Sequence, residues 1–250
     1  MDNDKKWKIL ITNDDGIASD GLMRLAKEAA KWGEVWVVAP DSQRSAASHS
    51  LTIDVPLDVT PVDWKLEGVH AFSCTGLPSD CVRLGCKYIM PEDPDVVFSG
   101  INNGFNVGTD IQYSATVGAA FDAAMGGYPA IAFSEGFTFD ERQRDADHAV
   151  TKTYLPKVVE ELLNEDLVPG VVINVNFPDC PLEECGGILR NRRASMGNPY
   201  IDTYRLREER QDGTRRYTIH WIDRNYADEG TDLRALLDGF VSIGVVNNIS

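Results

Sequence analysis

Two adjacent carboxylates, Asp14 and Asp15, follow the apolar run at residues 9–11 and precede Gly16. Two unit charges about 4 Å apart repel by about 1 kcal/mol in water and by about 4 kcal/mol at an effective dielectric constant near 20. A divalent cation removes that repulsion, and Mg²⁺ and Mn²⁺ prefer oxygen ligands. The same residues also suit a turn or a helix cap, and adjacent side chains in an extended chain diverge. The pair therefore indicates a hard-metal site or a simple turn.

A serine-rich loop, APDSQRSAASHS, spans residues 39–50 and begins where the second apolar run ends. Its hydroxyl and backbone N–H groups would reach a metal ion or a phosphate if the loop lay beside the two aspartates. His49 is a candidate acid for a leaving group, but a histidine at such a position more often braces the loop. Taken alone, a polar loop of this kind indicates only a surface connection.

The segment SGINNGFNVGTDIQYSATVGAA, residues 99–120, is more specific. Its first ten residues include three asparagines and three glycines, and it enters a helical pattern through Ser114 and Thr116. Glycines let a backbone approach a ligand closely, and a helix start offers free N–H groups to an anion. These features outline a phosphate cradle, although the GxxxxGK[ST] pattern is absent. The alternative is a glycine-rich turn before a capped helix.

The elements that would position these loops alternate along the chain. Strands are predicted at residues 8–12, 35–39, 96–98, 129–134 and 171–178, and segments 51–59 and 69–73 are expected to be extended. Helices are predicted at residues 21–32, 78–90, 114–125 and 140–164, the first of them capped by Ser19 or Asp20. This alternation predicts an α/β fold with a Rossmann-like three-layer core and a mostly parallel sheet. Ligands of such sheets bind outside the carboxyl ends of the strands, where Asp14 and Asp15 stand.

The pattern changes after about residue 187. Two extended arms flank Asp212 and Gly213, which is a strong hairpin signal, and a helix and a final strand follow at residues 231–246. We expect one domain over residues 1–250, made of a catalytic core (1–186), a hairpin arm used in oligomerisation (187–226) and a segment that returns to the core (227–250). Arginines and tyrosines interleave in the arm, which would permit RNA binding, but its acidic neighbours favour an oligomer contact.

Composition narrows the function. The net charge of −15 disfavours nonspecific binding to nucleic acid and to anionic membranes. No apolar stretch approaches the roughly 20 residues of a membrane span, and no signal peptide is recognisable, so we expect a cytoplasmic protein without a membrane segment. The five cysteines match no common zinc or redox spacing and are expected to be reduced thiols.

Taken together, five segments resemble the SurE family of survival-protein nucleotidases. They are ILITNDDGI, VVAPDSQRSAASHSLT, TGLPSDCV, FSGINNGFNVGTDIQYSATVGAA and TDLRALLDGFVSI, in the order of the family. The resemblance implies a phosphatase that uses one divalent metal ion (Mg²⁺, Mn²⁺ or Co²⁺) and hydrolyses nucleoside 5′- and 3′-monophosphates. It also implies a Rossmann-like core and a hairpin arm that assembles a homodimer or homotetramer.

The resemblance assigns site residues by their positions in this sequence. The metal ligands would be Asp14, Asp15, Ser45 and Asn102, with Asp14 or Asp15 taking a proton from the attacking water. Phe105, Ala115 and Ser48 depart from the usual family pattern, which affects loop shape and therefore substrate preference. The phosphate-binding side chains would be those of Asn13, Asn106, Ser114 and Thr116.

Two rival functions remain at this stage. An aspartyl-phosphate phosphatase also needs an aspartate at a strand end, but such enzymes generally show D-x-D, and the two acids here are adjacent. A Rossmann-like core could instead bind a nucleotide as a non-catalytic regulatory module. The missing GxGxxG after the first strand weakens the dinucleotide version of that function.

Overall fold

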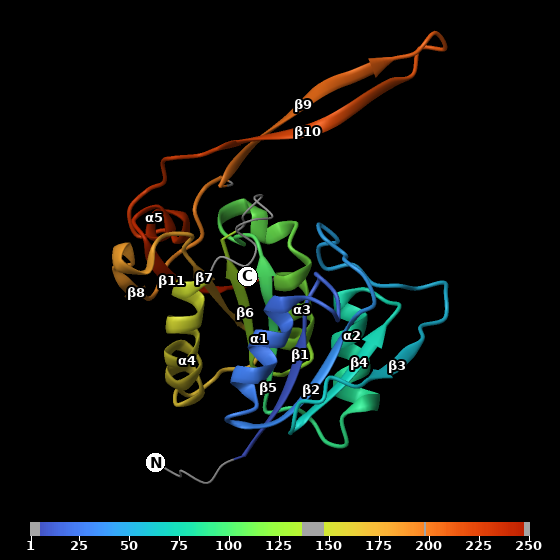
Figure 1. Cartoon of the computed structure of the whole chain (residues 1–250), viewed down its shortest axis with the longest axis vertical. Coiled ribbons are helices and arrows are strands. Elements are labelled where there is room, and N and C mark those ends of the chain that lie inside the picture. The colour runs from blue at the N-terminus through green and yellow to red at the C-terminus, as the bar shows by residue number, and fades with distance from the viewer. Residues whose placement is uncertain (1–5, 137–147, 198, 248–250) are drawn as a thin grey trace.

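The computed structural model describes residues 6–136, 148–197 and 199–247. A nine-stranded sheet forms its centre (Figure 1). In spatial order the strands are β3 (Val59–Val62), β4 (Val69–Cys74), β2 (Gly33–Pro40), β1 (Trp7–Thr12), β5 (Val96–Asn103), β6 (Ala130–Glu135), β7 (Val172–Phe177), β11 (Phe240–Val246) and β8 (Gly187–Leu189).

Most neighbouring strands run parallel. Strands β4, β2, β1, β5, β6 and β7 share one direction, and β8 pairs in parallel with β11. The antiparallel pairs are β3 with β4 and β11 with β7. The mostly parallel α/β fold expected from the sequence is therefore confirmed.

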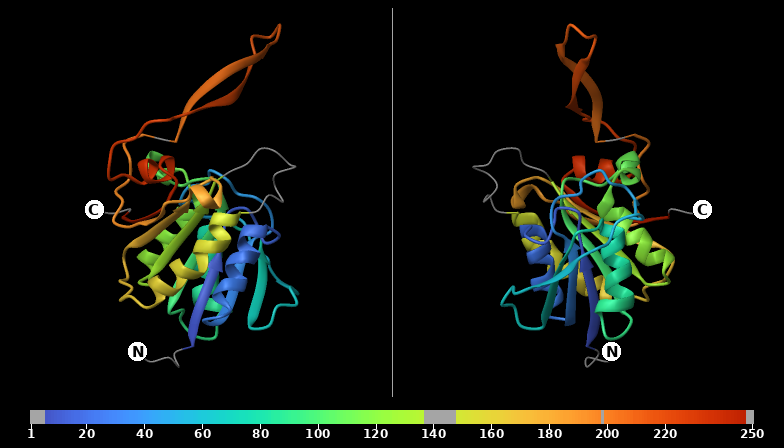
Figure 2. Two further views of the ribbon diagram at one scale, coloured as in Figure 1. Left: turned by 60° about the vertical axis from the view of Figure 1, so that its left-hand side comes forward. Right: turned by 90° about the vertical axis from the view of Figure 1, so that its right-hand side faces the viewer.

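Helices cover both faces of the sheet and complete three layers (Figure 2). Helices α1 (Asp20–Ala29) and α4 (Ala149–Leu163) pack on one face in a core with Ile9 and Ile11. Helices α2 (Pro78–Leu84) and α3 (Ala115–Met125) pack on the other face with Leu10. Successive β1 side chains point to opposite faces, so both faces must be covered, and this explains the continuous apolar run. Shorter helices are the π-helical turn Gly85–Ile89, the 3₁₀ turns Gly108–Gln112 and Leu182–Glu184, and α5 (Asp232–Leu237).

The chain reverses direction across the sheet at β1. From β1 it moves through α1 to β2 on one side, whereas β5 pairs with β1 on the other side. The loops after β1 and β5 therefore diverge, which opens a crevice at their carboxyl ends. Ser19 and Ser114 begin the next helices, because their side chains accept hydrogen bonds from Leu22 N at 3.4 Å and from Val117 N at 3.0 Å.

Three predicted elements differ from the structure. Segment 51–59 is mainly irregular, and only Val59–Val62 pairs, at the sheet edge; Pro56 has no N–H to donate to a ladder. Strand β5 continues to Asn103, five residues beyond its expected end at 98. Helix α4 begins at Ala149, whereas a helix was expected from residue 140, and residues 140–147 lie outside the described part of the chain.

The predicted hairpin is present as β9 (Tyr200–Glu209) and β10 (Arg215–Asp223), which form a separate two-stranded antiparallel sheet. It projects from the core as an arm (Figure 1). The register places Leu206 opposite Tyr217 and Tyr204 opposite Ile219 on one face, while Arg205 faces Thr218 on the other. The arm is therefore amphipathic.

Candidate active site

The turn after β1 is held by Asn13, which is fully buried. Its Nδ2 donates to the Gly16 carbonyl oxygen at 3.2 Å and to Ser19 Oγ at 2.7 Å, and its Oδ1 accepts from Gly16 N at 3.2 Å. Gly16 has a φ of +98°, a conformation that side chains other than hydrogen disfavour. The side chain of Asn13 is thus committed to the turn that presents Asp14 and Asp15.

Asp14 is buried, with 4% of its surface exposed. Its Oδ1 accepts a hydrogen bond from Thr116 Oγ1 at 2.5 Å, and its backbone oxygen accepts from Arg44 N at 2.7 Å. Burial and the charge of Asp15 raise the pKa of Asp14 to about 6, although the Thr116 hydrogen bond opposes that shift. The carboxylate is therefore held in place but costly to keep ionised without a positive charge nearby.

Asp15 connects two of the predicted loops. Gln43 Nε2 donates to Asp15 Oδ1 at 3.4 Å and to Ser45 Oγ at 3.0 Å, and Asn103 N donates to Asp15 Oδ2 at 3.1 Å. Burial raises the pKa of Asp15 and outweighs the hydrogen bonds from Asn103 and Gln43. The fold therefore brings the serine-rich loop and the end of β5 to the same carboxylate.

Asn102 completes the predicted ligand set. Its Nδ2 donates to the Gly104 carbonyl oxygen at 2.8 Å, and Oδ1 has no hydrogen-bond partner among the described residues. This arrangement leaves an amide oxygen for a ligand at the end of β5, next to Asn103, whose backbone N–H contacts Asp15.

The residues present fit a hard divalent cation. All four candidate donors are oxygens, which Mg²⁺ and Mn²⁺ prefer. No Lys, Arg or His of the described chain forms an ion pair with Asp14 or Asp15, so the described residues supply no counter-ion for this buried negative charge. The described residues hold no group of three or more His, Cys, Asp or Glu side chains suited to a metal. A hydroxyl and an amide oxygen would have to complete such a site.

Comparison with known proteins decides the family. The family described as "Survival protein SurE" matches residues 9–198. Proteins named 5'-nucleotidase SurE from Mesorhizobium japonicum and Clostridium botulinum are 36% and 37% identical to the chain, each over 94% of it and over 91% and 90% of their own lengths. The chain belongs to the SurE family. The crystal structure of the SurE protein from Aquifex aeolicus has a TM-score of 0.79 and 34% identity, and the match covers 96% of this chain and 93% of that one.

Three predicted phosphate-binding side chains of this SurE-family chain already have structural partners. Asn106 donates from Nδ2 to Ser134 Oγ at 2.8 Å, and its backbone N donates to Asn176 Oδ1 at 2.8 Å. Ser114 caps α3, and Thr116 holds Asp14. Thr116 contacts Asp14 directly, and the hydroxyl and amide groups of the three side chains fix the loop and the helix start.

Sequence reasoning missed Gln43 and a cluster around Glu135. Glu135 ends β6 and is 3% exposed, with Arg24 Nη1 donating to it at 3.1 Å and His148 Nδ1 lying 3.1 Å from its Oε2. Burial alone would raise the pKa of Glu135, but the hydrogen bonds from His148 and Arg24 hold it below its usual range. The strand-end rule that selected Asp14 would also have selected Glu135. These three residues line a cavity of about 300 Å³ that includes Asp15.

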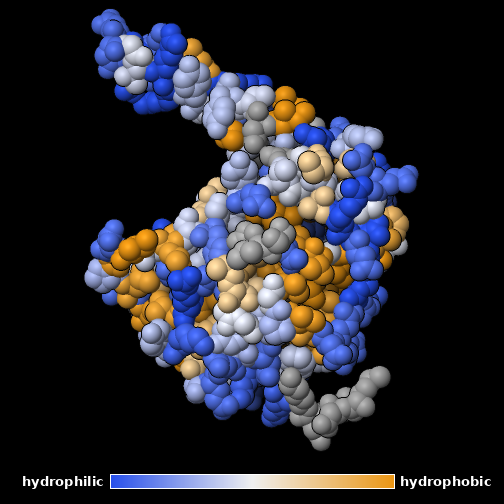
Figure 3. Space-filling model, turned by 180° about the vertical axis from the view of Figure 1, so that it is seen from behind, coloured by the Kyte–Doolittle hydropathy of each residue, from blue (hydrophilic) through white to orange (hydrophobic). Residues whose placement is uncertain are grey.

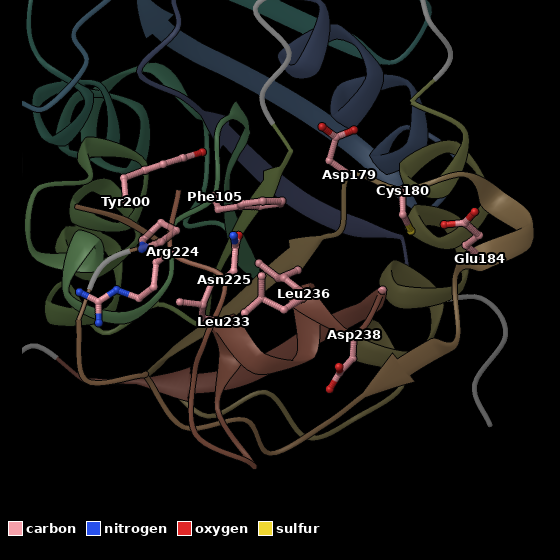
Figure 4. Close-up of a pocket in the computed structure, with 13 residues that line it drawn as sticks. Phe105, Asp179, Cys180, Glu184, Tyr200, Arg224, Asn225, Leu233, Leu236 and Asp238 are labelled. Atoms are coloured by element: carbon pink, nitrogen blue, oxygen red, sulfur yellow. The ribbon is translucent and has the colours of Figure 1, made fainter. Parts of the chain in front are cut away.

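A larger cavity of about 520 Å³ lies at the base of the arm. Figure 4 shows Asp179, Cys180 and Glu184 on one side of it and Tyr200 and Arg224 on the other. The four candidate metal ligands are not among its lining residues, so cavity size does not locate the SurE site. None of the helices in the described ranges is long and apolar enough to cross a membrane.

Proposed function

We propose that this chain is a 5′-nucleotidase that hydrolyses nucleoside 5′-monophosphates, and also 3′-monophosphates, with one divalent metal ion. The relatives named 5'-nucleotidase SurE support the reaction class. The observation that carries the proposal is the pair Asp14 and Asp15 at the carboxyl end of β1, without a counter-ion among the described residues and joined through Gln43 to Ser45. A phosphomonoester bound through a cation is the ligand that this arrangement suits.

The chain's own groups have separate tasks in this mechanism. A bound Mg²⁺, Mn²⁺ or Co²⁺ supplies Lewis acidity, which polarises a phosphoryl oxygen and makes a water more acidic. Asp14, Asp15, Ser45 and Asn102 would hold the ion, and one aspartate would accept the proton of the attacking water. Thr116 keeps Asp14 in one orientation, since its hydroxyl donates to Oδ1.

Phosphate contacts are assigned to the start of α3 and its preceding loop. Asn106 lies in the loop before α3 and Ser114 caps the helix, and the two residues are 6% and 8% exposed. The first turn of α3 adds backbone N–H groups that favour an anion. Asn13 and Thr116 would contribute by shaping the turn and orienting Asp14. Stabilisation of charge that develops on the phosphoryl oxygens is where most of the rate enhancement should arise.

A phosphate-release assay on chelator-stripped protein tests this proposal. The substrates are a panel of nucleoside 5′- and 3′-monophosphates, with Mg²⁺, Mn²⁺ or Co²⁺ added back singly. We expect no turnover without metal and turnover after addition of at least one ion. Nucleotide binding without release of phosphate would support a regulatory module, and a phosphorylated aspartate trapped during turnover would support aspartyl-phosphate chemistry.

We also propose that the arm binds a second copy of the chain and so forms a homodimer or homotetramer. Leu206, Tyr217, Tyr204, Ile219 and Trp221 are 39–70% exposed along β9 and β10. Hydrophobic residues interrupt the hydrophilic surface of the arm in Figure 3. An isolated two-stranded sheet is marginally stable in water, and coverage of its apolar face would stabilise it. The division into core 1–186, arm 187–226 and return segment 227–250 belongs to the same proposal, except that β8 (Gly187–Leu189) pairs with β11 in the central sheet.

A further inference from the structure

Asp122 is a buried carboxylate that the proposed mechanism does not use. It lies in α3 with 4% of its side chain exposed, and it accepts hydrogen bonds from two segments. Arg83 of α2 donates from Nε at 3.0 and 3.1 Å and from Nη2 at 2.8 Å, and His49 Nε2 lies 3.1 Å from Oδ1. Burial alone would raise the pKa of Asp122, but these hydrogen bonds hold it below its usual range. A charged acceptor therefore faces the serine-rich loop.

The serine-rich loop is strained between Ser45 and His49. Ala46 and Ser48 have φ values of 58° and 53°, in the left-handed region that non-glycine residues rarely adopt. Such residues cost on the order of 1 kcal/mol or more each and persist only where their surroundings impose them. This stretch follows Ser45 directly, so its conformation must be held by contacts with the surrounding structure.

Helix α3 and the 3₁₀ turn that precedes it supply those contacts. A Cβ on Gly118 would come within 2.5 Å of the Ser48 carbonyl oxygen, so only glycine lets the helix approach the loop this closely. Ser48 N and Oγ donate to the Tyr113 and Gln112 carbonyl oxygens at 3.1 and 2.9 Å. Asp122 lies one turn beyond Gly118 and meets His49. The same helix carries Thr116, so it orients both Asp14 and the loop that carries Ser45.

We propose that Asp122 and His49 are positioning residues that hold the strained loop so that Ser45 can complete the cation site. The inference rests on the proposed function, because it assigns Ser45 to the metal. Partners behind metal ligands typically contribute 10- to 100-fold to metal affinity. The sequence offers His49 as an acid or as a brace for the loop, and its contact with Asp122, 73 residues away, is the anchor that a brace requires.

Mn²⁺ binding, measured by calorimetry on chelator-stripped protein, tests whether Asp122 and His49 hold the loop in place. Relative to the wild type, His49→Ala should weaken Mn²⁺ binding by about tenfold or more. His49→Gln offers an amide donor near the position of Nε2 and should stay within about threefold. His70→Ala is the matched control, since His70 Nε2 lies 2.9 Å from the exposed carboxylate of Glu34; it should bind as the wild type does. Arg83→Met removes the other partner of Asp122 and should lower the unfolding midpoint more than it changes Mn²⁺ affinity.

Kinetic measurements distinguish a positioning role of His49 from a role as general acid. Loss of a general acid costs about 10²- to 10⁴-fold in kcat, which added metal does not restore. For His49→Ala we expect a higher Mn²⁺ requirement and a loss in kcat of less than about tenfold at saturating Mn²⁺. Three results would overturn the positioning role of Asp122 and His49: unchanged Mn²⁺ affinity in His49→Ala, an equal loss in His70→Ala, or failure of His49→Gln to recover affinity. A wild-type protein that binds no Mn²⁺ would refute the proposed function itself, which is a separate outcome.

Discussion

The carboxyl edge of the sheet and the hairpin arm depart in opposite ways from the usual distribution of residues. The edge buries charge, and the arm exposes apolar surface. At the edge, Asp14 is 4% exposed and has no counter-ion in the part of the chain that the structure describes. On the arm, Tyr204 and Tyr217 are 70% and 51% exposed and have no cover from the core. Buried unpaired charge and exposed apolar surface are both unfavourable in a chain taken alone.

Different binding partners would stabilise the two regions. A cation would neutralise the carboxylates at the edge, and another protein surface would cover the apolar face of the arm. The remainder of the chain follows the ordinary pattern, with apolar residues inside two cores on either side of the sheet. Residues that do not suit their surroundings are expected at functional sites. Experiments on these two regions should therefore have the clearest effects.

The largest expected effect is on catalysis at the edge. Asp14→Asn keeps an oxygen that accepts from Thr116 Oγ1, so the fold should persist while the carboxylate is lost. We expect phosphate release to fall by about 10²- to 10³-fold in metal-replete buffer, with an unchanged circular dichroism spectrum. Asp212→Asn, at the exposed turn of the arm, is the control and should retain full activity. Full activity of Asp14→Asn would refute the role given to Asp14.

Stability should show the next largest contrast. Leu10 of β1 is fully buried, whereas Leu206 of β9 is 49% exposed. Leu10→Ala removes packed methyl groups and leaves a cavity, which should lower the free energy of unfolding by about 3 kcal/mol. Leu206→Ala should change it by less than about 0.5 kcal/mol in the monomer. Urea denaturation of dilute protein measures both values, and similar losses would contradict the contrast.

The sequence predicts the framework of the site better than its contacts. Apolar runs and the turn at Asn13–Gly16 place the aspartates at a strand end, and this position follows from local patterns alone. The hydrogen bond between Thr116 and Asp14 joins residues 102 positions apart, and that between Arg24 and Glu135 joins residues 111 apart. Such pairs arise from how helices pack on the sheet, so no local pattern reveals them. The sequence predicts that Thr116 binds phosphate, but it does not reveal that the Thr116 hydroxyl donates to Asp14.

Some predicted strand boundaries are wrong for a related reason. Segment 51–59 has the β-branched residues of a strand, yet most of it does not pair, because pairing depends on a neighbour and on backbone donors that Pro56 lacks. The hairpin arm is predicted correctly, because its signal is a local turn at Asp212 and Gly213. Tertiary context therefore limits prediction most at the edge of the sheet and at the site.

The amphipathic arm permits a matched test of association. Ile219 lies on the apolar face opposite Tyr204, and the adjacent Thr218 lies on the other face opposite Arg205. Ile219→Glu places a charge in the surface that a second copy would cover and should weaken self-association by at least about tenfold. Thr218→Glu should leave it nearly unchanged. Light scattering across a concentration series measures the assembly, and equal behaviour of the two variants would argue against a contact through the apolar face.

The pH dependence of stability should show the weakest contrast. It concerns two carboxylates of low pKa, Asp122 in α3 and Asp212 at the turn of the arm. Several hydrogen bonds keep the pKa of buried Asp122 below the ordinary value of 3.8, and the Thr214 backbone N–H lowers the pKa of exposed Asp212. A carboxylate whose pKa is depressed by folding stabilises the protein above its unfolded pKa, and this contribution is lost as pH falls through the folded pKa. Asp122→Asn should therefore be less stable than the wild type at pH 7 by about 1 kcal/mol, with the gap narrowing below about pH 4. Asp212→Asn should match the wild type throughout, because solvent screens its charge. Urea midpoints measured between pH 7 and pH 2.5 give both differences, and a gap for Asp122→Asn that stays constant with pH would show that its ionised form contributes nothing to stability.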